Sequence, residues 1–356
     1  MAVAEIKIEN LLEEVVKQDS SDLHLTVGAP PTLRIDGFLK PVTGMGPLTA
    51  EEVEKLTMSV LNQSQKDILL KDKEVDFSFS FGDIARFRAN AYHQKGNIGL
   101  ALRLIPVKIR TVEELGLPPI IDKFTELPRG LVLCTGPTGS GKSTTLAAMV
   151  DKINREKMVH IITIEDPIEY THNHKKAMLD QREVHYDTRS FSAALRSVLR
   201  EDPDVVLIGE MRDLETIASA ITIAETGHLV LATLHTNNAA QSMDRIIDVF
   251  PPYQQPQIRV QLSNILQGVI SQRLIPAVGG GRVAVAEILF TTPAVRNIIR
   301  EGKTHQLDAV IQTGGEYGMI TMDKALALQV KSGKITADDA KGYCIDTDEF
   351  EKLLRG

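Results

Sequence analysis

One run of residues has the types and spacing that bind the phosphates of a nucleotide. After the apolar run 131–134, the chain follows the pattern G-x-x-x-x-G-K-[ST], and a predicted helix begins within it. The residues of this phosphate loop are Gly136, Pro137, Thr138, Gly139, Ser140, Gly141, Lys142, Ser143 and Thr144. Its glycines let backbone N–H groups wrap the β- and γ-phosphates, and the helix N-terminus adds partial positive charge. Because Lys142 can reach the terminal phosphates and Ser143 can bind Mg²⁺, the sequence predicts a site for ATP and Mg²⁺.

Side chains that can act on a bound nucleotide follow three other predicted strands, at 159–164, 205–209 and 229–234. They are Glu165, Asp166 and Glu169 after the first strand, Glu210 after the second and His235 after the third. In an open parallel sheet, ligands bind outside the carboxyl ends of the strands. Each residue by itself has an alternative explanation as a helix cap or a solvated charge, but the three strand ends together predict an ATP hydrolysis site.

The acidic residues form two sets with different expected roles. Glycine stands at position 209, where an Asp often ends the strand that orients Mg²⁺, and Glu210 follows it directly. We therefore expect Glu210 to orient the metal shell through water, and it can also polarise the attacking water. The acids at 165–169 can supply the general base instead. The residues alone leave this choice open.

Two histidines lie at the two ends of the predicted strand 229–234. The seven steps along the chain from His228 to His235 span about 23 Å when extended, at roughly 3.3 Å each, so one metal ion cannot bind both. We expect His235 at the nucleotide edge, where it can sense the γ-phosphate by hydrogen bonding. His228 is expected at the opposite edge, either at an interface or as a satisfied structural histidine.

Phosphoryl transfer also needs positive charge on its transition state, often from an arginine of a neighbouring domain or subunit. Arg86, Arg88 and Arg103 lie on predicted strands of the first domain, and alternation places Arg86 and Arg88 on one face. These arginines are candidates for that role, with ordinary surface charge as the alternative.

The elements that must position these residues form two predicted domains. Residues 1–104 alternate between helical and strand patterns and predict an α+β domain, 105–118 a linker, and 119–356 the ATPase domain. In the first domain we expect a helix within 1–20, a hairpin turn at Asp36-Gly37 and a helix at 49–71 that opens with a capping box.

The ATPase domain is predicted to be an α/β domain whose parallel sheet has helices on both faces. Its expected strands are 131–135, 159–164, 205–209 and 229–234, and its expected helices are 142–154, 190–200 and 213–225. Beyond Thr236 we expect mostly helix, including an apolar stripe at 258–270. Gly279-Gly280-Gly281 is expected to open a strand pair, and 293–356 to form a helical tail.

Composition excludes several classes of protein. The chain has 356 residues, 43% of them apolar, and a net charge of −7, which argues against nucleic acid as the main partner. It has two cysteines without metal or disulfide spacing, and it lacks the roughly 18-residue apolar run of a spanning helix. The N-terminus is acidic and amphipathic rather than a signal peptide, so we expect a cytoplasmic protein.

Beyond the phosphate loop, the chain resembles the PilT-type type IV pilus retraction ATPases of the secretion-ATPase superfamily over almost its whole length. The resemblance is carried by long strings at Ile164–Glu169, Ala194–Asp204, Gly209–Asp213, Thr226–His228 and Leu234–Thr236. It implies a PAS-like first domain, a RecA-like second domain and a ring-shaped homohexamer. It also implies that ATP binds between domains and subunits, with the first-domain arginines reaching its phosphates.

The resemblance further assigns roles to individual residues. It implies that Glu169 is important for hydrolysis and that the segment 195–204 serves retraction itself. Arg200, within that segment, and His228 are therefore expected to be interface or sensor residues. The string Ala194–Asp204 departs from the family only at Val198, where alanine is common; the change is apolar for apolar and puts little in doubt.

Partners and location also follow from the resemblance. It implies a PilC-type platform protein of the inner membrane, with the motor peripheral on its cytoplasmic side, and a second retraction ATPase as a further partner. Extension and type II secretion ATPases are longer and carry a four-cysteine zinc element, which two cysteines cannot build. Those motors, a PilU-like accessory role, a nucleic-acid translocase and a nucleotide-binding scaffold without turnover stand as the alternatives.

Overall fold

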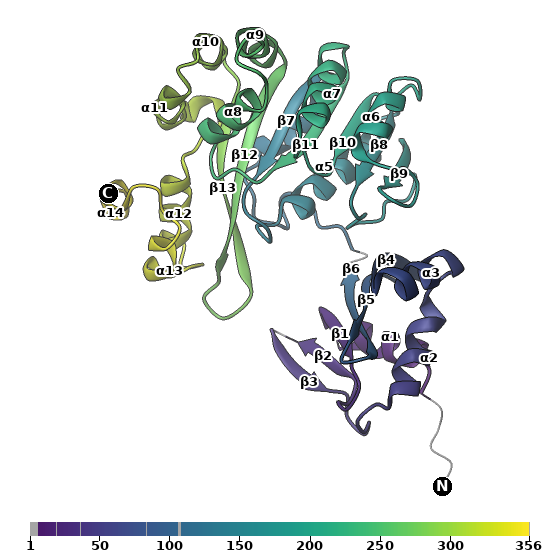
Figure 1. The fold of residues 1–356 in the computed structure, drawn as a ribbon. Coiled ribbons are helices and arrows are strands. Elements are labelled where there is room, and N and C mark those ends of the chain that lie inside the picture. Colours follow the sequence, from purple (N-terminus) through teal and green to yellow (C-terminus); the bar gives the residue numbers. More distant parts are fainter. Residues whose placement is uncertain (1–5, 19, 36, 83, 106–107, 356) are drawn as a thin grey trace. The chain divides into compact units, whose positions relative to one another are not determined.

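The structure, a computed structural model, divides the chain into two compact units, Met1–Lys108 and Ile109–Gly356 (Figure 1). It describes residues 6–18, 20–35, 37–82, 84–105 and 108–355. The division falls within the predicted linker 105–118, of which residues 106 and 107 lie outside the described part. Each unit has a sheet and a hydrophobic core of its own.

The first unit is an antiparallel sheet of six strands in the order β3-β2-β1-β6-β5-β4. The strands are β1 (Asp22–Leu25), β2 (Thr32–Ile35), β3 (Phe38–Pro41), β4 (Glu74–Phe81), β5 (Ala85–Gln94) and β6 (Asn97–Ile105). The helices are α1 (Ile8–Lys17), α2 (Ala50–Val60) and α3 (Gln63–Asp72). The alternating apolar side chains of these strands, such as Phe87 and Leu100, pack with Leu11 and Val53 of the helices in one core. Apolar residues therefore alternate along these strands because one face of the sheet is buried against the helices.

The predicted single helix 49–71 is wrong, because the structure has two helices there. Thr49 and Glu52 form the predicted capping box at the start of α2. Asn62 then forms a second capping box with Gln65, which begins α3 after Leu61 has taken an extended conformation. A strong second N-cap ends the first helix, because the cap residue itself has a non-helical backbone. The predicted turn residue Asp36 lies outside the described residues.

The second unit contains a seven-stranded sheet in the order β13-β12-β7-β11-β10-β8-β9. Its strands are β7 (Gly130–Thr135), β8 (His160–Glu165), β9 (Met178–Glu183), β10 (Val205–Ile208), β11 (Leu229–Leu234), β12 (Leu266–Pro276) and β13 (Arg282–Phe290). All the pairs are parallel except β12 with β13. The four strands predicted at 131–135, 159–164, 205–209 and 229–234 are present, which confirms the predicted α/β fold.

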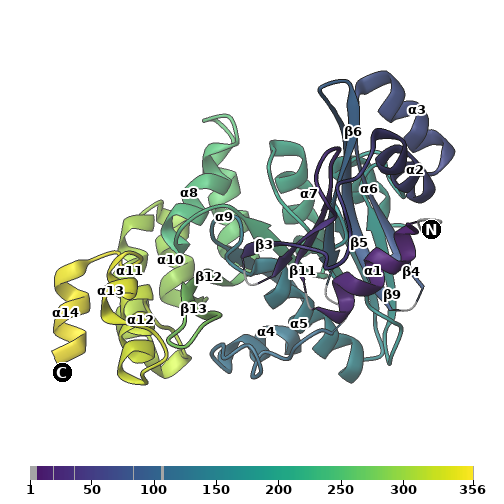
Figure 2. The same ribbon diagram turned by 90° about the horizontal axis from the view of Figure 1, so that it is seen from below.

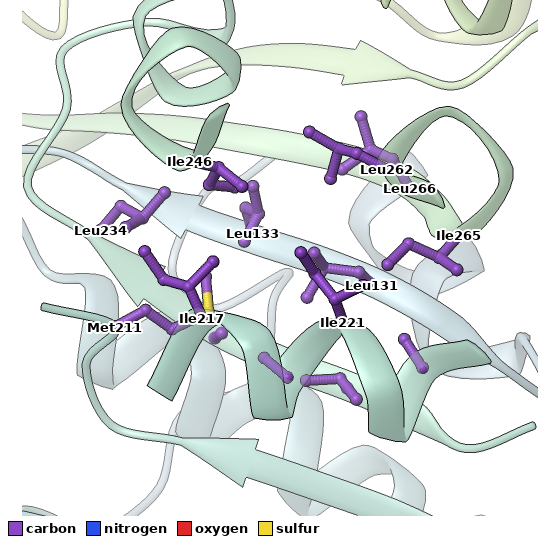
Figure 3. Packing of buried hydrophobic residues seen from close by; sticks show 14 of the residues in the cluster. Leu131, Leu133, Met211, Ile217, Ile221, Leu234, Ile246, Leu262, Ile265 and Leu266 are labelled. Carbon is purple, nitrogen blue, oxygen red and sulfur yellow. The ribbon is translucent and has the colours of Figure 1, made fainter. Parts of the chain in front are cut away.

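Helices cover both faces of this sheet. They are α4 (Ile120–Glu126), α5 (Lys142–Glu156), α6 (Phe191–Val198), α7 (Leu214–Glu225), α8 (Ala239–Asp248), α9 (Gln255–Ile265), α10 (Pro293–Glu301) and α11 (Leu307–Thr313). Leu131 and Leu133 of β7 pack against one set, α6 to α11, and Figure 3 shows them beside Ile217 and Ile221 of α7. The intervening Val132 and Cys134 pack against α4 and α5 on the opposite face (Figure 2).

The chain beyond α11 forms a small group of helices at one end of the β12–β13 hairpin. They are α12 (Met322–Lys331), α13 (Ala337–Lys341) and α14 (Thr347–Arg355), yellow in Figure 1. Leu326 of α12 and Phe350 of α14 pack with Ile275 of β12 and Val285 of β13 in a separate core cluster. The predicted helical tail thus packs on the β12–β13 hairpin, whose two strands belong to the seven-stranded sheet.

Two expectations about the second unit are wrong. The predicted apolar helix 258–270 ends at Ile265, and its last part is β12, a strand between β7 and β13. The three glycines at 279–281 lie between β12 and β13 and so turn the hairpin instead of opening it. The sequence did not predict strand β9, because its residues, MLDQRE, contain no apolar run. The strand lies at the edge of the sheet.

Candidate active site

The phosphate loop connects the buried strand β7 to α5 by a turn that only glycine can make. Gly136 has φ +142, and a Cβ atom there would lie 2.4 Å from the backbone oxygen of Gln272. Gly141 has φ +89 and immediately precedes Lys142, the first residue of α5. These positive angles favour glycine and bring loop N–H groups and the helix N-terminus to one place. The predicted strand, loop and helix are therefore present in that order.

The side chain of Lys142 folds back onto the first residues of the phosphate loop. Its Nζ atom donates to the backbone oxygens of Gly136, at 2.8 Å, and Pro137, at 3.1 Å. Burial lowers the pKa of Lys142, and the nearby Glu210 and Glu169 act in the opposite direction. Both carboxylates thus act electrostatically on the lysine that is expected to contact the phosphates.

Glu210 and His235, which follow two adjacent strands, are in contact. His235 Nε2 lies 3.3 Å from Glu210 Oε1, and Arg212 Nη2 lies 2.7 Å from Glu210 Oε2. Burial raises the pKa of Glu210, but the hydrogen bond from Arg212 and the nearby His235 outweigh it and lower the pKa. Glu210 is therefore held as a carboxylate with a cationic or donor group on each oxygen. Sequence reasoning did not identify Arg212, although it lies two residues beyond Glu210.

Glu165 has different surroundings from Glu210. Its Oε1 atom accepts from the Thr163 hydroxyl at 2.6 Å and from the Gln181 amide at 3.2 Å, and the Glu169 N–H lies 3.5 Å from its Oε2. Burial dominates and raises the pKa of Glu165 to about 6. The sequence did not predict that Gln181, on the unexpected strand β9, binds this carboxylate.

The presence of glycine at position 209 is explained by the closeness of the end of β8. A Cβ atom at this position would lie 3.2 Å from both the Cα atom of Glu165 and the backbone oxygen of Ile164. Strands β8 and β10 pair in parallel, so their carboxyl ends approach closely. A side chain at 209 would therefore crowd the end of β8, which favours glycine at this position and places the first carboxylate after β10 at Glu210.

A small cavity of about 30 Å³ lies beside Ser143, the predicted Mg²⁺ ligand. Its polar lining comes from Ser143, Thr163, Glu165, Tyr170, His172 and Thr233. The Tyr170 hydroxyl is also 2.8 Å from the Thr144 hydroxyl, which fastens the segment after Glu169 to α5. A cavity of this size and polarity has room for about one water molecule.

Asp166 and Glu169 are exposed at the same edge. Asp166 raises the pKa of Arg212 through its charge, after the larger effect of Glu210, so it lies near that guanidinium. The carboxylate of Glu169 has no hydrogen bond or ion pair to any residue that the structure describes. The structure thus brings the predicted acidic residues to one edge of the sheet in three different environments.

His228 and Arg200 lie away from this group. His228 precedes β11, and its Nδ1 atom is 3.0 Å from the backbone oxygen of Ile223 and 3.1 Å from the Thr226 hydroxyl. Arg200 is exposed in the connection between α6 and β10. Both therefore lie toward the amino ends of the parallel strands, opposite the phosphate loop, as predicted for His228.

The three candidate arginines of the first unit, Arg86, Arg88 and Arg103, share one face of its sheet. Arg88 and Arg103 are directly opposite each other on β5 and β6, and Arg86 is two residues before Arg88. Arg86 donates to the Ser78 hydroxyl at 2.6 Å, and Arg103 forms an ion pair with Asp22 at 2.9 Å. Arg88 is exposed.

The donors at the phosphate loop fit Mg²⁺ as it binds with nucleotides. The described residues contain no cluster of three or more His, Cys, Asp or Glu side chains that would hold a metal ion on its own. Mg²⁺ usually binds through one or two protein ligands together with phosphates and water. The Ser143 hydroxyl and the ionised Glu210, which would act through water as predicted, form a donor set of this kind.

Over the part of the chain that the structure describes, no helix has both the length and the apolar character needed to cross a bilayer.

Comparison with known proteins yields consistent matches. A profile of the Type II/IV secretion system protein family matches residues 1–340. The "Type IV pilus retractation ATPase PilT" of Pseudomonas aeruginosa is 52% identical over 334 residues, which cover 94% of this chain and 97% of that protein. A "Twitching motility protein" of Neisseria gonorrhoeae is 50% identical over 87% of this chain and 83% of that protein. The crystal structure of the pilus retraction motor PilT with bound ADP has a TM-score of 0.92 and 48% identity, over 98% of this chain and 100% of that one.

Proposed function

This chain belongs to the Type II/IV secretion system protein family, in its branch of pilus retraction ATPases, and we propose that it hydrolyses ATP to drive the retraction of a type IV pilus. The observation that supports this most is the site itself, where Lys142, Glu210 and His235 converge at the carboxyl edge of the parallel strands. The chain is also similar in structure to a pilus retraction motor that was solved with bound ADP. The nucleotide is ATP, and Mg²⁺ is its expected metal.

The residues of the site divide the work of hydrolysis. The loop N–H groups and Lys142 bind the phosphates, and Ser143 holds Mg²⁺, which when bound neutralises charge on the β- and γ-phosphates. Both oxygens of Glu210 are bonded to Arg212 and His235, which lowers its basicity and suits it to orient the metal's water shell. His235 donates to a γ-phosphate oxygen as that oxygen gains charge.

We assign the general base to Glu169. Glu165 is half-buried and its Oε1 atom already accepts two hydrogen bonds, whereas the carboxylate of Glu169 has no hydrogen-bond or ion-pair partner among the described residues and acts on Lys142 through its charge. Glu169 takes a proton as water attacks the γ-phosphorus atom and the bond to the bridging oxygen of ADP breaks. The products are ADP and phosphate.

The remaining assignments complete this proposal. The first unit is a PAS-like domain, and its Arg86, Arg88 and Arg103 supply positive charge to a nucleotide bound in a homohexamer. His228 and Arg200 serve subunit contacts or sensing. The motor is cytoplasmic and acts at the inner membrane on a PilC-type platform protein, with a second retraction ATPase as a further partner.

The direction of force is tested in the host cell. A Glu210→Ala variant of this gene is expected to give excess surface pili and loss of twitching, measured by electron microscopy and by the spread of colonies. Cells without pili would mean that the motor extends pili. Unchanged pili and movement would contradict the proposal, and DNA-stimulated ATP hydrolysis of the purified protein would favour a translocase instead.

A further inference from the structure

A buried carboxylate lies behind the site and has no part in the hydrolysis just described. Glu287 stands within β13, and 2% of its surface is exposed. Burying a carboxylate is costly unless hydrogen bonds satisfy its oxygens. The partners that compensate this cost are therefore the groups that Glu287 holds in place.

Two of these partners are the first residues of two helices. Glu287 Oε1 lies 2.9 Å from the backbone nitrogen of Ala239, where α8 begins. The backbone N–H of Met322, where α12 begins, also acts on this carboxylate and lowers its pKa. Helix N-termini present unsatisfied N–H groups and partial positive charge, so both are favourable partners for a carboxylate. One side chain thus joins two helix ends to β13.

A third partner links Glu287 to the phosphate loop. Ser271 lies directly opposite Glu287 in the β12–β13 pair, and its hydroxyl lowers the pKa of the carboxylate. The hydroxyl of Thr135, the last residue of β7, donates to Ser271 at 3.1 Å. Thr135 directly precedes Gly136, and both hydroxyl residues are fully buried. A buried row of polar side chains, Thr135, Ser271 and Glu287, therefore runs from the start of the loop to β13.

A short segment of three residues joins His235, which pairs with Glu210, to the start of α8 at Ala239. Between them, Asn237 accepts from Arg273 at 2.9 Å and the Thr236 hydroxyl is 2.6 Å from the Ser242 hydroxyl. The anchor at Ala239 is the point where this segment meets the sheet. A shift of α8 would therefore move His235 relative to Glu210.

We propose that Glu287 is a positioning residue: it holds the segment His235–Asn238 in the geometry that hydrolysis needs, and through α12 it couples that segment to the C-terminal helices. This inference rests on the proposed ATP hydrolysis. It assigns the β12–β13 hairpin a role in transmitting the state of the nucleotide.

The test is Glu287→Gln, measured by steady-state phosphate release of the full-length protein. Gln has one oxygen acceptor and a donor in place of the second acceptor, so it cannot accept from all three partners. We expect kcat to fall roughly 10- to 100-fold, as for a displaced catalytic group, with KM for ATP and affinity for ADP changed less than about twofold.

Asp323→Asn is the matched control. Asp323 is 6% exposed and accepts the N–H groups of Ile345 and Asp346, at 2.7 and 3.0 Å, so it is also a buried carboxylate that binds backbone. Its contacts lie within the C-terminal helices, and its loss is expected to lower the melting temperature but leave kcat unchanged. An unchanged kcat in Glu287→Gln, or an equal loss in Asp323→Asn, would overturn the inference. A wild-type protein that releases no phosphate would overturn the proposed function instead.

A milder variant and a second readout cover the case in which Glu287→Gln does not fold. Ser271→Ala removes one donor to the carboxylate and is expected to lower kcat about threefold, the effect of one hydrogen bond, with KM unchanged. Hydrogen exchange of folded variants is expected to show that ADP protects the start of α12 in the wild type but less in Ser271→Ala. Equal kcat and equal protection in the two proteins would contradict the coupling.

Discussion

At the scale of residues, chemically similar carboxylates around the phosphate loop differ because of their partners. Glu210 is kept ionised by Arg212 and His235, whereas burial raises the pKa of Glu165 to about 6. Glu169 is exposed, with no partner among the described residues. These surroundings are the basis for the roles proposed above: Glu210 as the metal-orienting acid, Glu165 as a structural acid and Glu169 as the base. Each role can be tested by a conservative substitution.

Lys142→Ala is expected to lower phosphate release by at least roughly 100-fold, because a buried cation that faces the phosphates is lost. Lys152→Ala is its control, since Lys152 lies on the same helix but pairs with Glu156 at 2.8 Å. The measurements are phosphate release and binding of a fluorescent ADP. A Lys142→Ala protein with wild-type turnover would show that the phosphate loop does not bind the hydrolysed nucleotide.

Glu169→Gln and Glu210→Gln are expected to fail in different ways. Without its general base, Glu169→Gln loses roughly 100-fold or more in kcat at every Mg²⁺ concentration. Glu210→Gln also needs more Mg²⁺ for its half-maximal rate, because the ionised group that orients the metal shell is gone. Titration of kcat against Mg²⁺ distinguishes them, and a Glu169→Gln protein of full activity would move the base to Glu210.

At the scale of elements, the β12–β13 hairpin connects the nucleotide edge with the C-terminal helices. β12 pairs with β7, which enters the phosphate loop, and β13 carries Glu287. The far end of the hairpin packs against α12 and α14. The hairpin, whose first strand was partly predicted as helix, therefore contacts both the strand that enters the phosphate loop and the C-terminal helices.

Glu287 predicts a pH dependence of folding stability. Burial is the main reason that its pKa rises to about 7 from a model-peptide value of 4.5; Asp308 adds to the rise, and the bonds from Ala239, Ser271 and Met322 oppose it. Arg273 is the cation that faces it. Between these two values the folded state binds more protons than the unfolded state, so this group's contribution to the free energy of unfolding falls as pH rises.

Urea unfolding of wild type and Glu287→Gln at about pH 5 and about pH 8 measures this contribution. We expect the wild type to lose more stability than the variant over that interval. Parallel changes in both proteins would show that Glu287 does not titrate there.

At the scale of the whole molecule, ATP hydrolysis in the second unit is proposed to need positive charge from arginines of the first unit. The first unit presents Arg86, Arg88 and Arg103 on one face of its sheet. Arg103 is paired with Asp22, and Arg86 with Ser78, so each has a partner within the unit. Arg88 is exposed on the same face and is the best test of the proposal.

Arg88→Ala is expected to lower kcat by roughly 1,000-fold if its guanidinium stabilises the transition state in the assembled hexamer. Arg34→Ala is the control, because Arg34 belongs to the same sheet and lies 3.7 Å from Asp22. Phosphate release is measured at protein concentrations where size-exclusion chromatography shows the hexamer. Equal rates in the two variants would exclude Arg88 as the source of the charge.

The features that sequence alone determined are those carried by adjacent residues. Prediction of the phosphate loop, of the capping box of Thr49 and Glu52, and of the acids at or just beyond the ends of β8 and β10 needed no distant information. Each depends on local backbone geometry or on a strand and the turn after it, so a short window of residues contains its physical cause.

Tertiary structure decided which distant residues meet. The apolar residues of β12 matched a helical spacing because a strand buried on both faces does not alternate. β9 gains its place from pairing with β8, and through Gln181 it satisfies Glu165. The contacts of Glu287 with the starts of α8 and α12 join segments far apart in the chain. Such pairings depend on the packing of the whole unit, and no local pattern of residue types records them.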